Sequence, residues 1–302
     1  MQKENIFDVI IVGGSYAGLS AAMSLGRSSR RVLIIDSGKP CNQQTPHSHN
    51  FLTRDGETPA NLAAIAKAQV LAYPTVKMIN AFAESAAKTN LGFEVSTADH
   101  QKFLSKKLVL ATGVKDIFPN IIGFAKCWGI SVLHCPYCHG YEVKGKKLGV
   151  IANGEIGFEF SKLIYNLSKD LTIFTNGAIE IDQASQQKLA SKNINIVEKG
   201  IDELFHENGL VNTIKFKDGS TQPIEAIFAR VGMEQNTKII TDLGVKLTDL
   251  GYVEVDFMKK TNVTGVFAAG DCTTMFRAVA EAVAAGNIAG AIVNKELVAD
   301  EF

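Results

Sequence analysis

A glycine-rich turn between a predicted strand and a predicted helix constrains the fold of this chain more than any other feature. Residues 8–12 read Asp-Val-Ile-Ile-Val, a short apolar run typical of a strand buried on both faces of a parallel sheet. Gly-Gly-Ser-Tyr-Ala-Gly follows over 13–18, a helix is expected over 19–25, and a second strand over 31–36 ends in an aspartate. This order of strand, glycine turn, helix, strand and acid predicts a dinucleotide-binding unit.

Individual positions of this unit have distinct physical roles. Gly13 permits the tight turn, and Gly18 lets the helix pack closely on the strand. The helix N-terminus presents backbone N–H groups that can bind a pyrophosphate, and Asp36 can accept hydrogen bonds from ribose hydroxyls. Ser15 stands where the fingerprint usually has its middle glycine, so the phosphates would be held slightly differently.

A second unit of the same kind follows later in the chain. A strand over 148–151, the turn Ala-Asn-Gly-Glu-Ile-Gly over 152–157, a helix and a strand over 171–174 repeat the order. The fingerprint is degraded here, because Ala152 replaces the first glycine and neither an acid nor an arginine follows the second strand. Two interpretations remain open: a working nicotinamide site, or a domain kept for its packing, its dimer contacts or its substrate surface.

Composition limits the classes of partner. The 302 residues correspond to about two domains. Thirty-one basic side chains balance 31 acidic ones, so no overall attraction for nucleic acid or an anionic membrane exists, and neither partner is expected. The N-terminus lacks the basic region of a signal peptide, and the longest apolar segment, 282–293, is too short to span a bilayer. A cytoplasmic location is therefore expected.

The stretch His-Cys-Pro-Tyr-Cys-His-Gly over 134–140 predicts redox chemistry. Cys135 and Cys138 can close a small ring at a helix N-terminus, where a thiolate is stabilised and the pair is reversibly oxidised. His134 and His139 add proton carriers that titrate near neutral pH. Zinc binding is the competing interpretation, but structural zinc usually needs a second ligand pair and the other cysteines are isolated, so no metal is expected.

Two further segments complete the pattern. A strand over 107–110 ends in Ala-Thr-Gly, and a strand near the C-terminus ends in Gly270-Asp271. In this order, the motifs resemble the low-molecular-weight thioredoxin reductase family of FAD-dependent disulfide oxidoreductases over essentially the whole chain. The resemblance implies a homodimer of an α/β fold with two Rossmann-like, three-layer nucleotide-binding domains, the second inserted into the first. The FAD-binding domain would comprise residues 1–115 and 246–302, and the inserted NAD(P)H-binding-like domain residues 116–245.

The resemblance also implies roles for single residues. Cys138 would face the flavin and form a charge-transfer contact, and Cys135 would exchange with the substrate. His139 stands where the reductases usually have an acid, so it would move protons. The residues expected around the FAD are Gly13, Gly14, Ser15, Ala17, Gly18 and Gly113, with Asp36 at the adenosine ribose, Gly270 and Asp271 at the ribityl–phosphate portion, and Asn42 and Asn50 beside the isoalloxazine.

Departures from the reductase pattern weaken the case for NADPH. The paired arginines that hold its 2′-phosphate are missing, which favours poor NADPH binding and leaves NADH use open. The stretch Cys-Pro-Tyr-Cys-His-Gly-Tyr-Glu over 135–142 and the segment 41–51 resemble instead a branch that includes gliotoxin- and holomycin-type dithiol oxidases. His47 and His49 of that segment either line the flavin pocket or belong to a surface loop.

The expected function is an FAD-dependent exchange of electrons between the flavin and a dithiol or disulfide substrate through Cys135 and Cys138. A small molecule and a thioredoxin-like protein both fit as substrate. One alternative is an oxygen-dependent oxidase of small-molecule dithiols that uses no nicotinamide. A remoter alternative is a flavin-binding redox sensor without turnover.

Overall fold

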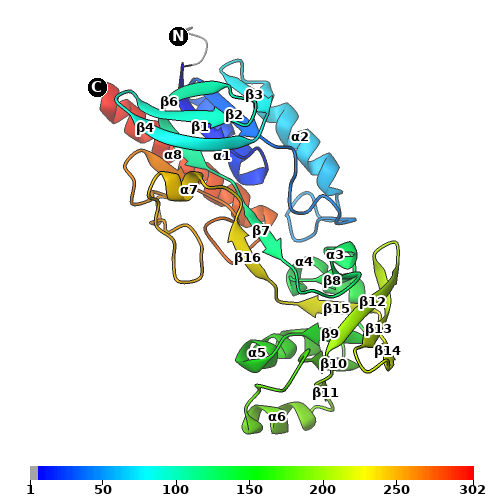
Figure 1. Ribbon diagram of the computed structural model, residues 1–302. Coiled ribbons are helices and arrows are strands. Elements are labelled where there is room, and N and C mark those ends of the chain that lie inside the picture. The colour runs from blue at the N-terminus through cyan, green and yellow to red at the C-terminus, as the bar shows by residue number, and fades with distance from the viewer. Residues whose placement is uncertain (1–5) are drawn as a thin grey trace. The chain divides into compact units, whose positions relative to one another are not determined.

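The computed structural model describes residues 6–302, which form two compact units (Figure 1). Of these described residues, unit 1 comprises 6–43, Asn50–Lys115 and Met233–Phe302, and unit 2 comprises Gln44–His49 and Asp116–Gly232. The first five residues of the predicted FAD-binding domain lie outside the described residues.

A seven-stranded mixed sheet forms the centre of unit 1. Its strands are β1 (Ile6–Val12), β2 (Val32–Asp36), β3 (Val76–Asn80), β4 (Ala83–Thr89), β5 (Gly92–Thr97), β6 (Lys102–Leu110) and β17 (Val266–Ala268). Their order is β3-β2-β1-β6-β5-β4, with β17 pairing with β6. The antiparallel strand β5 pairs with the first half of β6, and the parallel strand β17 pairs with residues 108–110 of β6. One edge of β6 therefore serves two neighbours.

Alternate residues of β1 face opposite sides of this sheet, as the pleat requires. Val9 and Ile11 belong to the core cluster shared with the helices α1 (Tyr16–Arg27), α2 (Pro59–Leu71) and α8 (Val279–Glu301). Ile10 and Val12 belong to the cluster on the other face, with residues of the β4–β5 hairpin and of α7 (Ile239–Asp242). The strand predicted to be buried on both faces is therefore buried on both.

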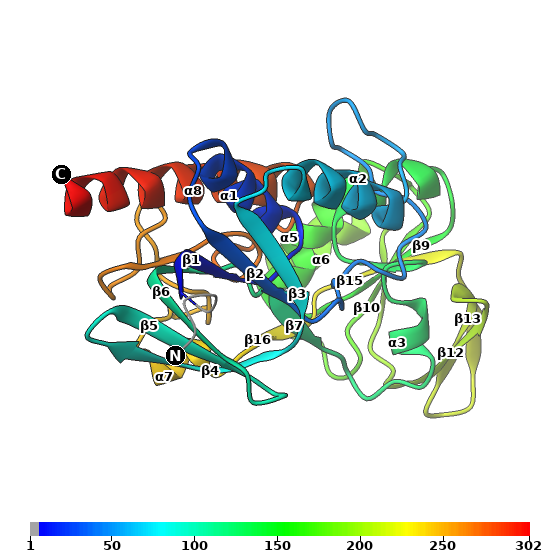
Figure 2. The same cartoon turned by 90° about the horizontal axis from the view of Figure 1, so that it is seen from above.

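Helix α1 packs against α8 at backbone distance, and Figures 1 and 2 show the two helices side by side. A Cβ atom at Gly286 of α8 would collide with the carbonyl oxygen of Ala17 in α1. The Ser20 hydroxyl donates a hydrogen bond of 2.6 Å to the carbonyl oxygen of Val283. The small residues of α8 thus allow this helix to lie directly on the helix that follows the glycine turn.

Unit 2 contains a five-stranded parallel sheet and a three-stranded antiparallel sheet. The parallel sheet is formed, in spatial order, by β11 (Asn195–Val197), β10 (Leu171–Phe174), β9 (Leu148–Ile151), β15 (Ala226–Ala229) and β8 (Val132–Leu133). The antiparallel sheet is formed by β12 (Ile201–Glu207), β13 (Leu210–Phe216) and β14 (Thr221–Pro223). The helices are α3 (Phe124–Cys127), α4 (Pro136–His139), the 3₁₀ helix η2 (Tyr141–Val143), α5 (Gly154–Tyr165) and α6 (Gln183–Ala190). The prediction of two Rossmann-like units is confirmed.

The chain passes from unit 1 to unit 2 between residues 115 and 116 and returns between 232 and 233. The strands at these crossings, β7 (Val114–Ile117) and β16 (Gly232–Gln235), pair with each other. The return lies before the boundary of 245 and 246 expected from the sequence, because Ile239, Ile240 and Val245 are buried in the core of unit 1. The segment 44–49, expected in the FAD-binding domain, packs instead with unit 2, where Thr45 and Ser48 are buried.

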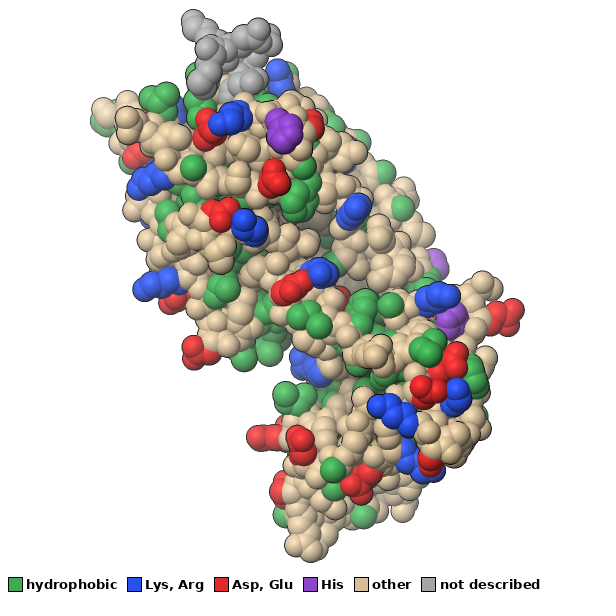
Figure 3. All heavy atoms as spheres, in the orientation of Figure 1, with side chains coloured by type: hydrophobic (Ala, Val, Ile, Leu, Met, Phe, Trp, Pro, Cys, Tyr) green, Lys and Arg blue, Asp and Glu red, His purple; other side chains and the backbone are tan. Residues whose placement is uncertain are grey.

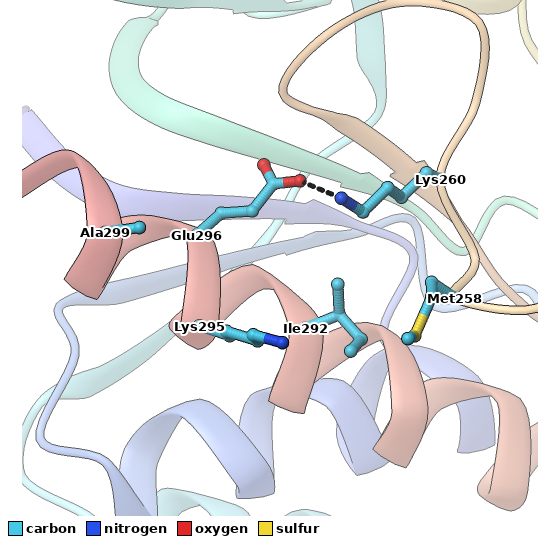
Figure 4. A pocket seen from close by; sticks show the side chains of 6 residues that line it. All are labelled: Met258, Lys260, Ile292, Lys295, Glu296 and Ala299. Atoms are coloured by element: carbon cyan, nitrogen blue, oxygen red, sulfur yellow. Dashed lines mark ion pairs between the residues drawn. The ribbon is translucent and has the colours of Figure 1, made fainter.

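The surface carries charges of both signs. Figure 3 shows basic and acidic side chains interspersed on the face that it displays, in keeping with the balanced composition. Over residues 6–302, no helix is long and apolar enough to cross a membrane. A small pocket of about 150 Å³ lies beside α8 and contains an ion pair of 2.6 Å between Lys260 and Glu296 (Figure 4). None of the predicted site residues lines it.

The contact between α1 and α8 generates a stability prediction. Replacing Gly286 by Ala adds one methyl group where the backbone of α1 leaves no room. At an exposed helix position, alanine is more stabilising than glycine by about 1 kcal/mol. Overpacking a close contact costs about 1–3 kcal/mol. We therefore expect Gly286→Ala to lower the thermal unfolding midpoint.

The control, Ala284→Ser on the exposed side of α8, should change the free energy of unfolding by less than about 0.5 kcal/mol. An unchanged or raised midpoint for Gly286→Ala would contradict the packing argument.

Candidate active site

The redox motif lies in unit 2, at the one-turn helix α4. Cys135 is the N-cap residue and Pro136 the first helical residue, a position where proline's fixed φ suits the helix. The turn brings Cys138 back beside Cys135, with their Cα atoms 5.3 Å apart, and a disulfide joins the two residues. The backbone N–H of Cys138 also donates a hydrogen bond of 3.2 Å to Sγ of Cys135. The cysteines thus form the pair that the redox interpretation requires.

A histidine from a distant segment approaches the one that follows the motif. His139 ends α4, four residues after Cys135, and residues at this spacing lie on one side of a helical turn. The ring of His49 meets that of His139 edge-on, with centroids 6.5 Å apart. Nε2 of His49 lies 3.4 Å from Oε1 of Glu142 in η2. Two imidazoles and one carboxylate therefore form a cluster next to the disulfide turn.

The environment of His139 favours its neutral form. Burial is the main cause and lowers the pKa of His139 below its usual value, while the Glu142 carboxylate raises this pKa and His49 lowers it. Because the net shift is downward, the imidazole is mostly neutral near pH 7. A neutral imidazole can accept a proton from a thiol.

The other two histidines have different surroundings. His134 stacks on Trp128 with ring centroids 5.9 Å apart, and Nε1 of Trp128 donates a hydrogen bond of 3.0 Å to Asp116. His47 is exposed, with its ring 6.3 Å from that of His49. The structure thus places His49 rather than His134 against His139. A role of His134 in proton transfer stays a prediction.

In unit 1, the predicted glycine turn has the geometry of a dinucleotide cradle. Gly13 has a φ of +103°, and a Cβ atom there would collide with the carbonyl oxygen of Ala111. A Cβ atom at Gly18 would collide with the carbonyl oxygen of Gly13. The N–H of Gly14 donates a hydrogen bond of 2.9 Å to Oδ1 of Asp36, so the acid at the end of β2 lies directly against the turn.

The N-terminus of α1 suits an anion. Ser15 is the N-cap residue, but its side chain makes no capping hydrogen bond. The first turn of α1, which lies wholly within the described residues, carries no acidic residue. The first N–H groups of a helix and the positive end of its dipole bind phosphates readily. These residues therefore fit a pyrophosphate, and the serine in place of the middle glycine does not block it.

Residues near the C-terminus join the same cradle. Gly270 has a φ of +83°, and a Cβ atom there would lie 2.8 Å from Cβ of Ala17. The carboxylate of Asp271 lies 3.4 Å from Nε of Arg277 and 3.8 Å from Sγ of Cys41. The expected proximity of the Gly270-Asp271 motif to the first turn is therefore present.

Three other residues predicted to contact the FAD are described by their backbone conformation or their hydrogen bonds. Asn42 forms a side-chain hydrogen bond with Tyr16, the first residue of α1, which places it near the glycine turn. Gly113 has a φ of +62°, as its position after β6 requires. Asn50 has a φ of +61°, and its N–H donates a hydrogen bond of 2.7 Å to Asp55. The flavin contact expected of Asn50 stays a prediction.

The corresponding turn of unit 2 is closed by side chains. Asn153 caps α5, and its Oδ1 accepts hydrogen bonds of 2.9 Å from the N–H groups of Gly154 and Glu180. Its Nδ2 donates a hydrogen bond of 2.8 Å to the carbonyl oxygen of Ala178. Glu155 adds a carboxylate to the first turn. The Asn153 side chain thus caps the helix and ties its N-terminus to the loop that follows β10.

Three residues of these sites are not among those predicted from the sequence. Glu142 lies three residues after His139, a spacing that could have suggested contact. Asn153 directly precedes a predicted helix, which is a capping signal. Arg277, the partner of Asp271, had no such signal, because it lies in the irregular segment before α8.

Comparisons with known proteins identify the family of this chain. A family model described as pyridine nucleotide-disulphide oxidoreductase matches residues 7–286. The protein named thioredoxin reductase tcpT, from Claviceps purpurea, is 32% identical over 99% of this chain and 97% of its own length. Thioredoxin reductase aclD from Aspergillus oryzae is 30% identical, with 98% of each chain covered. The crystal structure of the putative thioredoxin reductase TrxB from Bacillus anthracis, 31% identical, covers 98% of this chain and 100% of its own with a TM-score of 0.94. The redox disulfide, the dinucleotide cradle and these similarities together show that the chain is an enzyme of the pyridine nucleotide-disulphide oxidoreductase family, whose members are FAD-dependent flavoproteins.

Proposed function

We propose that this enzyme exchanges electrons between FAD and a dithiol or disulfide substrate through Cys135 and Cys138, and that unit 2 holds no working NADPH site. The observation that carries the proposal is the disulfide at α4, whose two cysteines are only partly buried. A solvent-accessible disulfide beside a neutral imidazole can exchange with an incoming thiol. The function therefore centres on thiol–disulfide exchange.

The glycine turn of unit 1 is the place where FAD would bind. Gly13, Gly14 and Gly18 let the turn pack closely on its neighbours, and the uncapped N-terminus of α1 next to it suits a pyrophosphate. Asp36 is oriented by hydrogen bonds from the N–H groups of Gly14 and Gly38, and its carboxylate oxygens keep lone pairs for ribose hydroxyls. FAD bound here supplies a two-electron acceptor and donor.

The exchange at the cysteines balances without another reagent. A substrate thiolate attacks Sγ of Cys135, the disulfide breaks, and Cys138 leaves as a thiolate. The second substrate thiolate then attacks the mixed disulfide and releases Cys135. The substrate becomes a disulfide, and the two cysteines become a dithiol that holds the two electrons. We assign to His139, whose lowered pKa keeps it mostly neutral, the acceptance of a thiol proton during this sequence.

Carboxylates disfavour a pyridine nucleotide in unit 2. Glu155 lies in the first turn of α5, and the N–H of Glu180 is already bound to Asn153. Glu198 accepts a hydrogen bond of 2.9 Å from the N–H of Ile179. A phosphate there would meet negative charge and occupied N–H groups, and each charge-assisted contact that it lacks costs about 1.5–3 kcal/mol.

The carboxylates and occupied N–H groups at the N-terminus of α5 favour electron flow from the substrate to the flavin, which is the basis of a second candidate function. Without a nicotinamide donor, electrons enter from the substrate, and oxygen is the acceptor that completes the reaction: a dithiol and oxygen give a disulfide and hydrogen peroxide. We infer an oxygen-dependent oxidase of a small-molecule dithiol. The homodimer and the cytoplasmic location stay predictions.

The first prediction concerns the cysteines. Cys138→Ser should keep the bound flavin but lose reduction of that flavin by dithiothreitol under anaerobic conditions, because the disulfide can no longer form. Flavin absorbance in a stopped-flow instrument measures both properties. Cys127→Ala is a suitable control, since burial raises the pKa of the Cys127 thiol and keeps it unreactive. Full activity of Cys138→Ser would refute the proposed function.

The second prediction separates oxidase from reductase. Under anaerobic conditions, NADPH and NADH should reduce the flavin much more slowly than a dithiol does, because the capped and acidic N-terminus of α5 disfavours the pyrophosphate that both donors carry. The loss of two charge-assisted contacts lowers affinity by about a hundredfold or more. In air, the dithiol should yield peroxide. Rapid bleaching by NADPH would instead show that unit 2 binds this donor in spite of its capped helix.

The third prediction concerns the cradle. Asp36→Ala removes the acceptor that orients the N–H groups of Gly14 and Gly38 and that would bind the ribose. FAD affinity should fall by about tenfold or more, because hydrogen bonds to a charged group contribute about 1.5–3 kcal/mol. The ratio of flavin to protein absorbance after dialysis reports the loss. Asp249→Ala, at an exposed position, should retain the wild-type ratio.

A further inference from the structure

The short segment 44–49 is far from the rest of unit 2 in the sequence but packs with it, and it contributes His49 to the surroundings of His139. The segment is anchored by the buried side chains of Thr45 and Ser48. Oγ1 of Thr45 lies so near Gly129 that a Cβ atom on that glycine, whose φ is +74°, would be 2.9 Å away. Tight anchoring of this kind fixes the position of His49 at the end of the segment.

The anchored histidine lies between two partners. Its Nε2 is 3.4 Å from the carboxylate of Glu142, and its ring meets that of His139 edge-on. Within the described residues, the Glu142 carboxylate from η2 raises the pKa of His139, and the His49 ring from segment 44–49 lowers it. The ring of His47 lies 6.3 Å from that of His49.

We propose that His49 and Glu142 are positioning residues for His139, which they hold as a proton shuttle between the substrate thiol and Cys138. This inference rests on the proposed function, because it assigns the shuttle to thiol–disulfide exchange. Glu142 stabilises the imidazolium enough for His139 to take a proton, and His49 destabilises it enough for His139 to release the proton.

The step balances in protons and electrons. The substrate S–H gives its proton to His139, and the resulting thiolate attacks Sγ of Cys135. The Cys135–Cys138 bond breaks, its electron pair stays on Cys138, and the His139 imidazolium protonates that sulfur. The products are a mixed disulfide on Cys135 and a neutral thiol on Cys138, with His139 again neutral. Both cysteines and His139 lie within five consecutive residues, at α4 and its N-cap.

Two substitutions that should shift the pKa of His139 in opposite directions test the proposal. The rate constant for anaerobic flavin reduction by dithiothreitol should fall at low pH, where His139 is protonated and cannot accept the thiol proton. Glu142→Gln removes a group that raises the pKa of His139, so this acidic limb should move to lower pH. His49→Gln removes a group that lowers the same pKa, so the limb should move to higher pH. His139→Gln should lose about a hundredfold in rate, as expected when a proton carrier is removed.

A second measurement does not depend on turnover. An NMR titration of the His139 ring in the oxidised holoenzyme, assigned by comparison with His139→Gln, should show the same two opposite shifts. The controls His100→Gln and Glu84→Gln, at exposed positions of unit 1, should leave the titration unchanged. Shifts of equal sign, or none, would overturn the positioning role while leaving the exchange reaction intact. Wild-type flavin that dithiothreitol cannot reduce would overturn the proposed function, and with it the shuttle.

Discussion

Backbone packing at glycine positions is the constraint on which unit 1 depends. At Gly13, Gly18 and Gly286, a side chain would collide with a carbonyl oxygen of a neighbouring segment. These contacts bring β1, α1, the end of β6 and α8 together, although the last of these helices comes from the far end of the chain. The cradle is therefore assembled from both ends of the sequence. Its N–H groups face outward from a core that is buried on both sides of the sheet.

Two turns of the same type have become chemically different. In unit 1, the N-cap residue Ser15 leaves the helix end without a side-chain cap, and an acid stands at the end of the adjoining strand. In unit 2, Asn153 occupies the equivalent helix end and ties it to the following loop, and carboxylates lie around it. The backbone fold is retained in both units, because helix–strand packing needs only small residues there. Capping and charge distinguish them.

The redox centre combines one local and one long-range interaction. The Cys-x-x-Cys spacing is enough to bring two sulfurs together, since one helical turn spans that distance. The surroundings of His139 depend instead on the anchored segment 44–49, whose His49 comes from 90 residues earlier in the chain. Burial lowers the pKa of His139, the Glu142 carboxylate raises it and the His49 ring lowers it. In the proposed reaction, His139 is the proton acceptor, and its surroundings come from a segment outside the motif.

The sequence by itself determined the glycine turn, the acid at Asp36, the redox cysteines and the presence of two Rossmann-like units, because each depends on spacing within one strand, turn or helix. It could not determine that the chain returns to unit 1 before Ile239, because that boundary depends on which core buries the apolar residues of 239–245. It also could not show that Asn153 closes the second turn or that His49 reaches Glu142. Only the tertiary structure decided these points, since side-chain contacts between distant segments depend on packing and leave no periodic pattern in the sequence.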